Sequence, residues 1–554
     1  MRTYGRIRLA SDRWLIEEIE PHVAIRLKQI FARVPKAGVA PFTLPHDLIT
    51  DADLDWFMSR YPLAISKEDR QALTIGRLGF EVRQKEMEAI LAPSYAPSGV
   101  VGIRPNQQLR PYQIQAIDLA KLRGALMIGD EVGLGKTYTA AGFMCAEPQA
   151  LPAAVVCDPH MQRQWFEKLT TFTRLRVHIV KKARPYRLPL ADVFVFRVTS
   201  IHGWVEVFDS GFFKSVIYDE PQSLRTGTKT NKGAAARVLS ERARWKIGLT
   251  ATPVYNYGDE MWQVMRFIDP EVLGEWEDFC REWCRLSGNG WRIKDPKALG
   301  TYLREQHALI RRLKADVGLQ LPKVSRIVEH IDYDAAAVAK VEDLARQLAI
   351  KATTGTFIDR GNAVRELDIM VRQATGVAKA PTVAKFARMI VEAGEPVVLW
   401  GWHREVYDIW NRDLSDLEPA MYTGSESSAR KSGELQRFLN GDTEVLIMSL
   451  RSGAGVDGIQ HRCSTGIFGE LDWAPGIHGQ CVGRLDREGQ KNPVTAFFLV
   501  TDDGSDPPMM EVLGIKASES TQIIDPHLGV QIEETDTTRL QKLVHRYLER
   551  REAA

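Results

Sequence analysis

Residues Ala125-Leu-Met-Ile-Gly-Asp-Glu-Val-Gly-Leu-Gly-Lys-Thr137 form an apolar run, a glycine-rich turn and the start of a helix-forming stretch. Four apolar residues that end at a turn are typical of a buried parallel strand. Gly133 and Gly135 allow backbone angles that are closed to other residues, so consecutive N–H groups can converge on a phosphate at the positive end of the helix. The stretch therefore predicts a nucleotide phosphate site, in which Lys136 pairs with the β- and γ-phosphates and Thr137 ligates Mg²⁺.

This loop departs from the strict pattern GxxxxGK[ST] at its first position. Asp130 stands there, and Gly129 lies one residue too early. A glycine turn that only caps a helix is the other interpretation, and the agreement of strand, turn and helix weighs against it. We therefore include Asp130 with Gly133, Gly135 and Lys136 among the residues expected to bind the cofactor.

A second apolar strand ends in two acids. Residues 215–222 read Ser-Val-Ile-Tyr-Asp-Glu-Pro-Gln, and Asp219 follows Lys136 by 83 residues. An Asp-Glu pair at a strand end is by itself more often the solvated start of a helix. After a phosphate-binding loop it has the form of a Walker B element, in which Asp219 holds Mg²⁺ and Glu220 polarises the attacking water.

Composition narrows the class of protein. The 554 residues are 44% hydrophobic and 26% charged, which is ordinary for a globular protein and excludes disordered and collagen-like classes. No apolar run approaches the ~18 residues of a spanning helix, and the first residues are interrupted by charge, so we expect a cytoplasmic chain without membrane contact. Six cysteines without a CxxC pair argue against a disulfide scaffold and a zinc ribbon. The net charge of +2 gives no reason to expect a polyanionic partner.

The chain divides by pattern into five parts. Two of them repeat short apolar runs followed by helical periodicity, which predicts an α/β class with parallel sheets. Their expected strands are 125–128, 153–157, 193–196, 216–218 and 245–248 in the first, and 397–400, 444–448, 465–468 and 495–500 in the second. The expected parts are an N-terminal accessory domain (1–103), lobe 1 (104–270), a mostly helical insertion (271–378), lobe 2 (379–505) and an acidic extension with a terminal helix (506–554).

Nine stretches of the sequence together resemble the motifs of a known family. From about Leu109 to Val500 the chain resembles helicase superfamily two, and within it the Swi/Snf-type ATPases that translocate on double-stranded DNA. The stretches that carry the resemblance are Leu109–Gln115 (Q motif), Gly129–Thr137 (P-loop), Val155–Trp165 (Ia), Val198–His202 (Ib), Gly248–Val254 (III), Ile310–Pro322 (a Swi/Snf block), Val397–His403 (IV), Ser449–Gly458 (V) and Gln480–Gln490 (VI). The resemblance implies two RecA-like lobes. Residues 26–34 faintly resemble the accessory domain of annealing helicases.

The resemblance also implies roles for single residues. Gln113 would read adenine, Gly455 would border the nucleotide, and Gln480, Arg484 and Arg487 would complete the site from lobe 2. Arg484 and Arg487 lie three apart and can both reach the cleft as arginine fingers. The nucleic-acid contacts implied by motifs Ia, Ib and V are His160, Arg163, Thr199 and Ser449.

Two positions differ from the family's usual pattern. Gln222 stands where motif II usually has His, so it cannot carry a proton and the coupling between nucleotide and DNA is expected to differ. Asp457 stands in motif V where a small residue is common, which brings a carboxylate near the expected phosphate track.

Two basic runs lie in lobe 1. Six bases and no acid occur from Arg174 to Arg187, and four bases without an acid lie between Glu220 and Glu241. Solvated loops are the other interpretation of either run. Their position beside motifs Ia, Ib and II favours phosphate contacts, which supply most sequence-independent affinity for DNA. We assign Arg225, Lys229 and Lys232 to this surface.

The sequence therefore predicts a DNA-dependent ATPase that uses ATP and Mg²⁺ to move along duplex or forked DNA without reading its sequence. Three alternatives stay open: a strand-separating helicase, an ATPase switch that signals to a protein, and an inactive binding module. The chain shows no nuclear-targeting basic cluster, so we expect a prokaryotic or phage-encoded protein.

Overall fold

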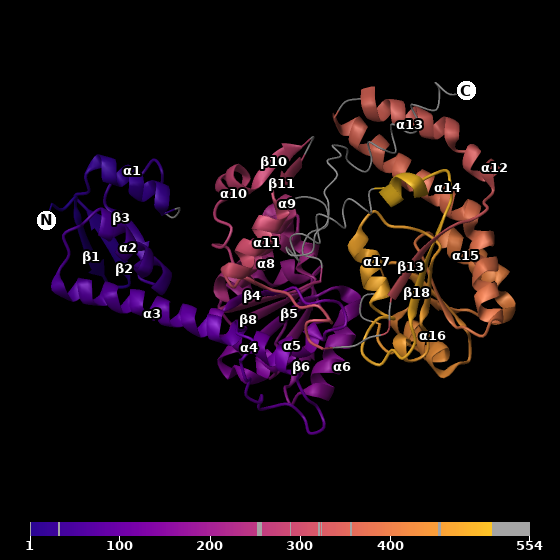
Figure 1. The fold of residues 1–554 in the computed structure, drawn as a ribbon, viewed down its shortest axis with the longest axis horizontal. Coiled ribbons are helices and arrows are strands. Elements are labelled where there is room, and N and C mark those ends of the chain that lie inside the picture. The colour runs from indigo at the N-terminus through magenta and orange to yellow at the C-terminus, as the bar shows by residue number, and fades with distance from the viewer. Residues whose placement is uncertain are drawn as a thin grey trace.

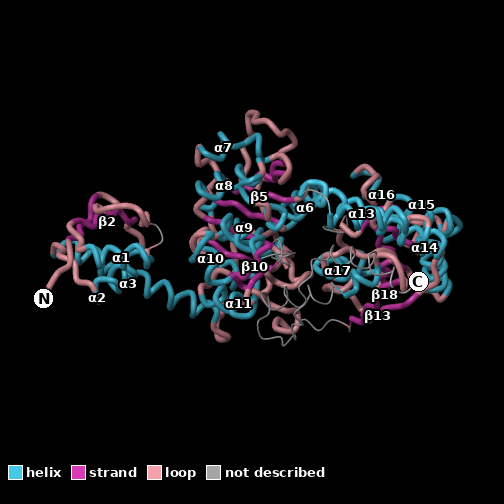
Figure 2. Tube along the Cα trace, turned by 90° about the horizontal axis from the view of Figure 1, so that it is seen from above, coloured by secondary structure: helices cyan, strands magenta, loops and turns pink. Residues whose placement is uncertain are grey.

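A computed structural model describes residues 2–31, 34–251, 258–287, 290–318, 322, 324–354, 357–451 and 456–511. It has an N-terminal unit at one end, joined by one long helix to two α/β lobes that lie side by side (Figures 1 and 2). Within the described ranges, no helix is long and apolar enough to cross a membrane.

Lobe 1 is built on a seven-stranded parallel sheet in the order β12-β4-β9-β8-β5-β7-β6. Its strands are β4 (Ala125–Ile128), β5 (Ala153–Cys157), β6 (Val177–Ile179), β7 (Val193–Arg197), β8 (Ser215–Asp219), β9 (Trp245–Leu249) and β12 (Leu309–Ile310). Its helices include α4 (Pro111–Arg123), α5 (Lys136–Ala146), α6 (Gln162–Phe172), α7 (Val205–Asp209) and α8 (Asn231–Arg242). Alternate residues of β8 enter different core clusters, Val216 and Tyr218 in one and Ile217 in the other, so both faces of the sheet are covered.

Lobe 2 repeats this architecture with a six-stranded parallel sheet in the order β13-β18-β17-β14-β16-β15. Its strands are β13 (Val324–His330), β14 (Val397–Gly401), β15 (Ala420–Tyr422), β16 (Val445–Ser449), β17 (Thr465–Phe468) and β18 (Val494–Val500). Its helices are α12 (Ala335–Ala339), α13 (Glu342–Thr354), α14 (Phe357–Glu392), α15 (Arg404–Asp413), α16 (Ser428–Asn440) and α17 (Pro475–Val482). Val398 and Trp400 of β14 pack on one face, and Val397 and Leu399 pack on the other.

The N-terminal unit has a core of its own. Strands β1 (Arg6–Ala10), β2 (Arg13–Glu17) and β3 (Phe42–Pro45) form an antiparallel sheet. Helices α1 (Pro21–Ile30), α2 (Leu48–Arg60) and the 25-residue α3 (Lys67–Leu91) accompany it. Residues such as Trp14, Phe57 and Leu73 form its buried cluster, which ends at Leu73, while Met87 near the far end of α3 packs into the core of lobe 1. The link between the two units is therefore a helix (Figure 1).

The expected helical insertion, residues 271–378, is divided between the lobes. Helix α9 (Gly258–Ile268) precedes this stretch and packs on lobe 1 through Met265. Helices α10 (Trp276–Trp283) and α11 (Pro296–Glu305) pack into the same core through Phe279 and Leu303, and the hairpin of β10 (Cys284–Ser287) and β11 (Gly290–Ile293) lies between them in sequence. The stretch also gives β12 to the sheet of lobe 1 and β13 to that of lobe 2. Strand β12 has only two residues, and β13 is largely exposed, so neither gives a clear apolar signal in the sequence. The sequence pattern therefore predicted a single helical segment here.

The boundary expected at 505/506 also differs in the structure. Asp506 is 2% exposed and lies in lobe 2, where its carboxylate accepts a hydrogen bond of 2.6 Å from Lys379 Nζ. A buried lysine needs such a partner, so the acid belongs to the lobe. Residues 512–554, with the rest of the acidic stretch and the expected terminal helix, lie outside the described residues.

Candidate nucleotide site between the lobes

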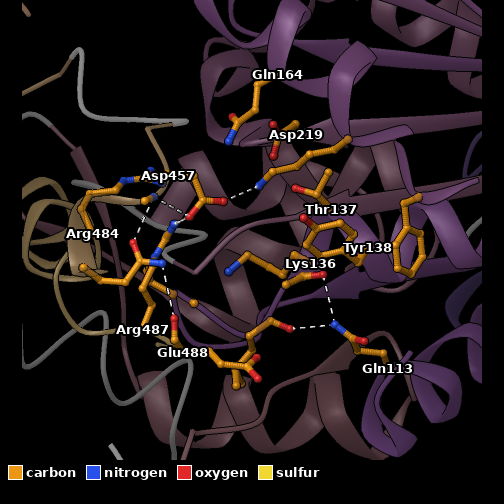
Figure 3. A pocket seen from close by; sticks show the side chains of 18 of the residues that line it. Gln113, Lys136, Thr137, Tyr138, Gln164, Asp219, Asp457, Arg484, Arg487 and Glu488 are labelled. Atoms are coloured by element: carbon orange, nitrogen blue, oxygen red, sulfur yellow. Dashed lines mark hydrogen bonds and ion pairs between the residues drawn. The ribbon is translucent and has the colours of Figure 1, made fainter. Parts of the chain in front are cut away.

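A cavity of about 710 Å³ lies between the two lobes. Lobe 1 contributes the loop after β4, the end of β8 and one side of α6, and lobe 2 contributes residues around motifs V and VI (Figure 3). It brings together ten of the residues expected to bind or hydrolyse the nucleotide: Gln113, Gly133, Gly135, Lys136, Thr137, Asp219, Glu220, Gln480, Arg484 and Arg487. Parallel strands bind ligands beyond their carboxyl ends, and β4 and β8 both end here.

The loop before α5 has the backbone conformation that its two glycines were expected to allow. Gly133 and Gly135 have φ angles of +97° and +73°, in the left-handed region. A Cβ on Gly135 would lie 2.7 Å from Gln113 Nε2, so this position also requires a residue without a side chain. Gln113 braces the loop: Nε2 donates to the Leu134 carbonyl at 3.1 Å, and Oε1 accepts from the Arg110 N–H at 2.9 Å. Gly135 is therefore required both by its backbone angle and by its close contact with Gln113.

Lys136 opens α5 and turns back over the loop. Its Nζ donates to the Asp130 carbonyl oxygen at 2.6 Å. Burial lowers the pKa of Lys136 to about 8, and the carboxylates of Glu220 and Asp130 oppose that shift. A poorly solvated ammonium with weak partners is a strong attractor for phosphate.

Asp219 and Glu220 lie at the end of β8, facing the loop. Asp219 Oδ2 accepts a hydrogen bond of 2.7 Å from Trp165 Nε1, a residue of α6. Burial raises the pKa of Asp219 to about 7, and the charge of Glu220 adds to the rise. Glu220 has φ +52°, an uncommon angle for a residue with a side chain, and its carboxylate accepts from Gln222 of the same lobe and, at 3.5 Å, from Gln480 of lobe 2. Gln222 therefore holds Glu220 in position.

Arg484 and Arg487 reach the cavity from the segment that follows α17. Arg484 Nη1 donates to the Val456 carbonyl at 3.3 Å, and burial lowers the pKa of Arg484 to about 10. Arg487 Nη1 donates to Asp457 Oδ1 at 2.6 Å. Both guanidiniums line the same cavity as Lys136, which gives the site cations from both lobes (Figure 3).

One expected cofactor contact is corrected by the structure. The Asp130 side chain is fully buried and forms an ion pair with the Arg312 guanidinium, which turns its carboxylate away from the cavity. Only its carbonyl oxygen touches the site, through Lys136. Arg312 lies 182 residues away, so the loop sequence could not reveal this pair. Gly455 and residues 252–254 of motif III lie outside the described residues.

The donor atoms around the loop fit a magnesium nucleotide. Thr137 and Asp219 supply a hydroxyl and a carboxylate oxygen, the ligands that Mg²⁺ prefers. Among the described residues there is no cluster of three His, Cys, Asp or Glu side chains that could hold a metal alone. This is the usual arrangement for Mg²⁺, which takes its remaining ligands from the phosphates and from water.

Comparison with known proteins decides the family. The profile of the SNF2-related domain matches residues 53–355, more than half of the chain. The chain belongs to the SNF2-related family. The predicted α/β class with two parallel sheets is confirmed by the sheet topology, and the profile covers lobe 1 and the first part of lobe 2.

Individual relatives of this SNF2-related chain are distant. The Caenorhabditis elegans homolog of SWI/SNF-related matrix-associated actin-dependent regulator of chromatin subfamily A-like protein 1 is 24% identical over 75% of this chain and 62% of that protein. The human DNA annealing helicase and endonuclease ZRANB3 is 24% identical over 78% of this chain and 42% of that protein. The Sulfolobus solfataricus SWI2/SNF2 ATPase core solved with dsDNA is 19% identical over 78% of this chain and 95% of that chain, with a TM-score of 0.38. The chain thus spans only 42% to 62% of the length of these two curated relatives.

The expected DNA contacts of this SNF2-related chain follow the carboxyl ends of its strands, outside the nucleotide cavity. Thr199 and Lys229 are exposed, whereas Ser449 is only 8% exposed. Arg163 pairs with Glu167 at 2.7 Å and Arg225 with Glu260 at 3.2 Å. Lys232 Nζ donates to the Ser223 carbonyl at 2.7 Å, and nothing is described of the His160 side chain. Part of this basic set is therefore neutralised within the chain.

The first basic run, residues 174–187, is also partly neutralised by an acid of the chain. Arg176 pairs with Asp192 at 2.6 Å, an acid from beyond the run. The exposed loop between β6 and β7 keeps Lys181, Lys182, Arg184 and Arg187, which form no ion pair with the residues that the structure describes. These four cations of the loop can therefore meet an external anion.

The sequence did not reveal several contacts in and beside the site. Lys168 of α6 lines the cavity, and Trp165 of motif Ia donates to Asp219. Lys314 crosses the cleft to Asp486 at 2.5 Å. Each of these contacts joins segments at least 54 residues apart, and no local spacing signals them.

Proposed function

We propose that this chain is a DNA-dependent ATPase that couples hydrolysis of Mg²⁺·ATP to translocation on duplex or forked DNA, independent of base sequence. The cavity between the lobes carries the proposal, because it joins a phosphate loop and two acids of lobe 1 to two arginines of lobe 2. Membership of the SNF2-related family and the name of a relative as a DNA annealing helicase support the same function.

The roles of the residues follow from their chemistry. Bound Mg²⁺·ATP supplies the γ-phosphoryl group that is transferred to water. Lys136 and the loop N–H groups hold the phosphates, and Thr137 and Asp219 offer oxygen ligands to the metal. Glu220, braced by Gln222, orients and deprotonates the water. The two motif VI arginines add positive charge from lobe 2, a contribution worth about 10³–10⁵ in rate where NTPases use such fingers.

Because the site is complete only when both lobes contribute, hydrolysis and lobe movement are coupled. Release of the γ-phosphate removes the anion that draws the arginines of lobe 2 towards lobe 1, so the cleft can open. DNA held by exposed cations of lobe 1, such as those of the β6–β7 loop, would then be moved relative to lobe 2 in each cycle. Phosphate contacts carry no base information, which suits movement along any sequence.

The first experiment measures ATP hydrolysis with duplex DNA, forked DNA, single-stranded DNA and RNA. We expect duplex or forked DNA to stimulate the rate more than RNA does. Glu220→Gln should abolish hydrolysis and still bind Mg²⁺·ATP, whereas Lys136→Ala should lose both. Glu395→Gln, at an exposed position of lobe 2, is the matched control and should keep the wild-type rate. Full activity of Glu220→Gln would refute the proposed site.

A second assay separates translocation from strand separation. Displacement of a triplex-forming strand without unwinding of a fork indicates a translocase, and unwinding of the fork indicates a helicase. A hydrolysis rate that does not change when DNA is added would instead indicate an ATPase switch.

A further inference from the structure

Asp457 bridges two cations that come from different lobes. Its Oδ1 accepts from Arg487 Nη1 of lobe 2 at 2.6 Å, and its Oδ2 lies 3.3 Å from Lys168 Nζ of lobe 1. All three residues line the nucleotide cavity, and Figure 3 shows Asp457 and Arg487 there. The side chains of Arg487 and Lys168 are 11% and 20% exposed, so both cations are largely removed from water and depend on this carboxylate.

Lys168 has no counter-ion besides Asp457 among the described residues. It projects from α6, and its Nζ lies 5.3 Å from the centre of the Tyr138 ring. Asp457 is its only ion-pair partner in the described part of the chain, although Glu167 is its neighbour in sequence. Burial lowers the pKa of Lys168, and Asp457 is the strongest opposing influence. The lysine of lobe 1 is thus stabilised only when lobe 2 is close.

Arg487 is fixed on two of its nitrogens. Nε donates to the Gly483 carbonyl at 3.0 Å, and Nη1 donates to Asp457. Nη2 has no acceptor among the described residues and remains for a ligand in the cavity. Two contacts on a planar guanidinium set the direction of its third nitrogen. Of the two acceptors only Asp457 is charged. Asp457 in turn pairs with Lys168 of lobe 1.

We propose that Asp457 and Lys168 are positioning residues: the carboxylate aims Arg487 at the reacting phosphate, and Lys168 makes that aim depend on closure of the cleft. This inference rests on the proposed ATPase function and adds two residues to its machinery. It also gives a role to the acid at position 457, where a small residue was expected. The device lets Arg487 reach its working direction only when the lobes are together.

The test compares Asp457→Asn, Lys168→Met and Lys168→Arg in the full chain. We expect Asp457→Asn and Lys168→Met each to lower kcat of the DNA-stimulated ATPase by about 10- to 100-fold, the loss typical of a misplaced catalytic group. KM for ATP and affinity for Mg²⁺·ADP should change by less than about 2-fold, a split that a general loss of structure would not produce. Lys168→Arg keeps the charge and should retain kcat. The double variant should be no slower than the slower single variant, because both act through Arg487.

The matched control is Asp416→Asn. Asp416 pairs with Arg388 of lobe 2 at 2.7 Å and, like Asp457, has a pKa held at about 2 by its arginine, yet it lies away from the cavity. It should leave kcat unchanged. A loss in KM or nucleotide affinity with normal kcat would overturn the inference, because Lys168 and Asp457 would then be ordinary ligand contacts.

Interlobe fluorescence energy transfer provides a readout without hydrolysis. With one dye on each lobe, Asp457→Asn and Lys168→Met should lower the closed population at saturating Mg²⁺ and a non-hydrolysable ATP analogue that keeps the γ-phosphate, and Asp416→Asn should not. If wild type closes as expected but hydrolyses no ATP, the proposed function fails and the interlobe bridge stands. If wild type is an active ATPase and both variants keep its kcat, the inference alone fails.

Discussion

At the scale of residues, two groups of the phosphate site have pKa values that approach each other. Burial raises the pKa of Asp219 to about 7 and lowers that of Lys136 to about 8. Asp219 must lose its proton to bind Mg²⁺, and Lys136 must keep its proton to attract phosphate. The working forms of both groups coexist best between these two values, so activity is sensitive to pH near neutrality.

We therefore expect a bell-shaped pH profile of kcat/KM for the DNA-stimulated ATPase. The rate should rise as pH approaches about 7, while Asp219 ionises, and fall above about 8, while Lys136 loses its proton. Steady-state kinetics in buffers of constant ionic strength would measure the profile, over a range from about two pH units below the pKa of Asp219 to about two above that of Lys136. Higher Mg²⁺ should move only the acidic limb to lower pH, because metal and proton compete for Asp219. An acidic limb whose position does not shift with Mg²⁺ concentration would contradict the assignment of this limb to Asp219.

At the scale of elements, the phosphate loop and the end of α17 approach each other without room for a side chain. A Cβ on Gly483 would lie 2.4 Å from Val132 Cγ1 of the loop. Gly483 itself has φ −64°, an angle that alanine adopts without strain. The contact with the other lobe is therefore the tightest constraint on this glycine, and within lobe 2 the new Cβ would lie 3.2 Å from the Gly479 carbonyl oxygen.

Gly483→Ala should hinder closure and lower kcat by about 10-fold, since displacement of catalytic groups by about 1 Å can cost up to 10²-fold. The melting temperature of lobe 2 should stay unchanged. Gly479→Ala, one turn earlier in α17 with nothing within 4 Å of the new Cβ, is the control and should remain active. Val132→Ala should restore part of the lost rate in the double variant. Equal losses in both glycine variants would show that closure is not the cause.

The elements also show which signals the sequence carries. The strands predicted from apolar runs coincide within one residue with nine strands of the two sheets, for example 125–128 with β4 and 465–468 with β17. The missed strands lie at or beside sheet edges: β6, β12, β13 and β15. Three of them have two or three residues, and β13 is only half buried, so neither length nor hydrophobicity marks them.

At the scale of the whole molecule, the N-terminal unit and the lobes have separate cores joined by α3 (Figure 1). Within the unit, α3 packs closely on α2: a Cβ on Gly76 would lie 1.8 Å from Asp51 Oδ2. Asp51 is 1% exposed and accepts a hydrogen bond of 2.6 Å from Trp14 Nε1. Neither the unit's core nor this contact involves the lobes, so the two parts should unfold independently.

Calorimetry of Gly76→Ala should show this independence. Overpacking of this contact should destabilise the N-terminal unit by about 1–3 kcal/mol and lower only its unfolding transition. Mg²⁺·ADP should raise only the transition of the lobes, because ligand binds their native state. ATPase activity without DNA should be that of wild type. A single transition that responds to both changes would contradict the division into separate units.

The order of motifs and the apolar strands, both local properties, determined the α/β class, the two lobes and most of the nucleotide residues. The net charge of +2 concealed a basic loop, since it averaged that loop against acids elsewhere. Tertiary structure alone decided the partners: Asp130 is turned to Arg312, Arg176 is neutralised by Asp192, and Asp457 is held by Lys168 across the cleft. Electrostatic pairs act over a few ångströms in space whatever their separation in sequence, so only the folded chain specifies them.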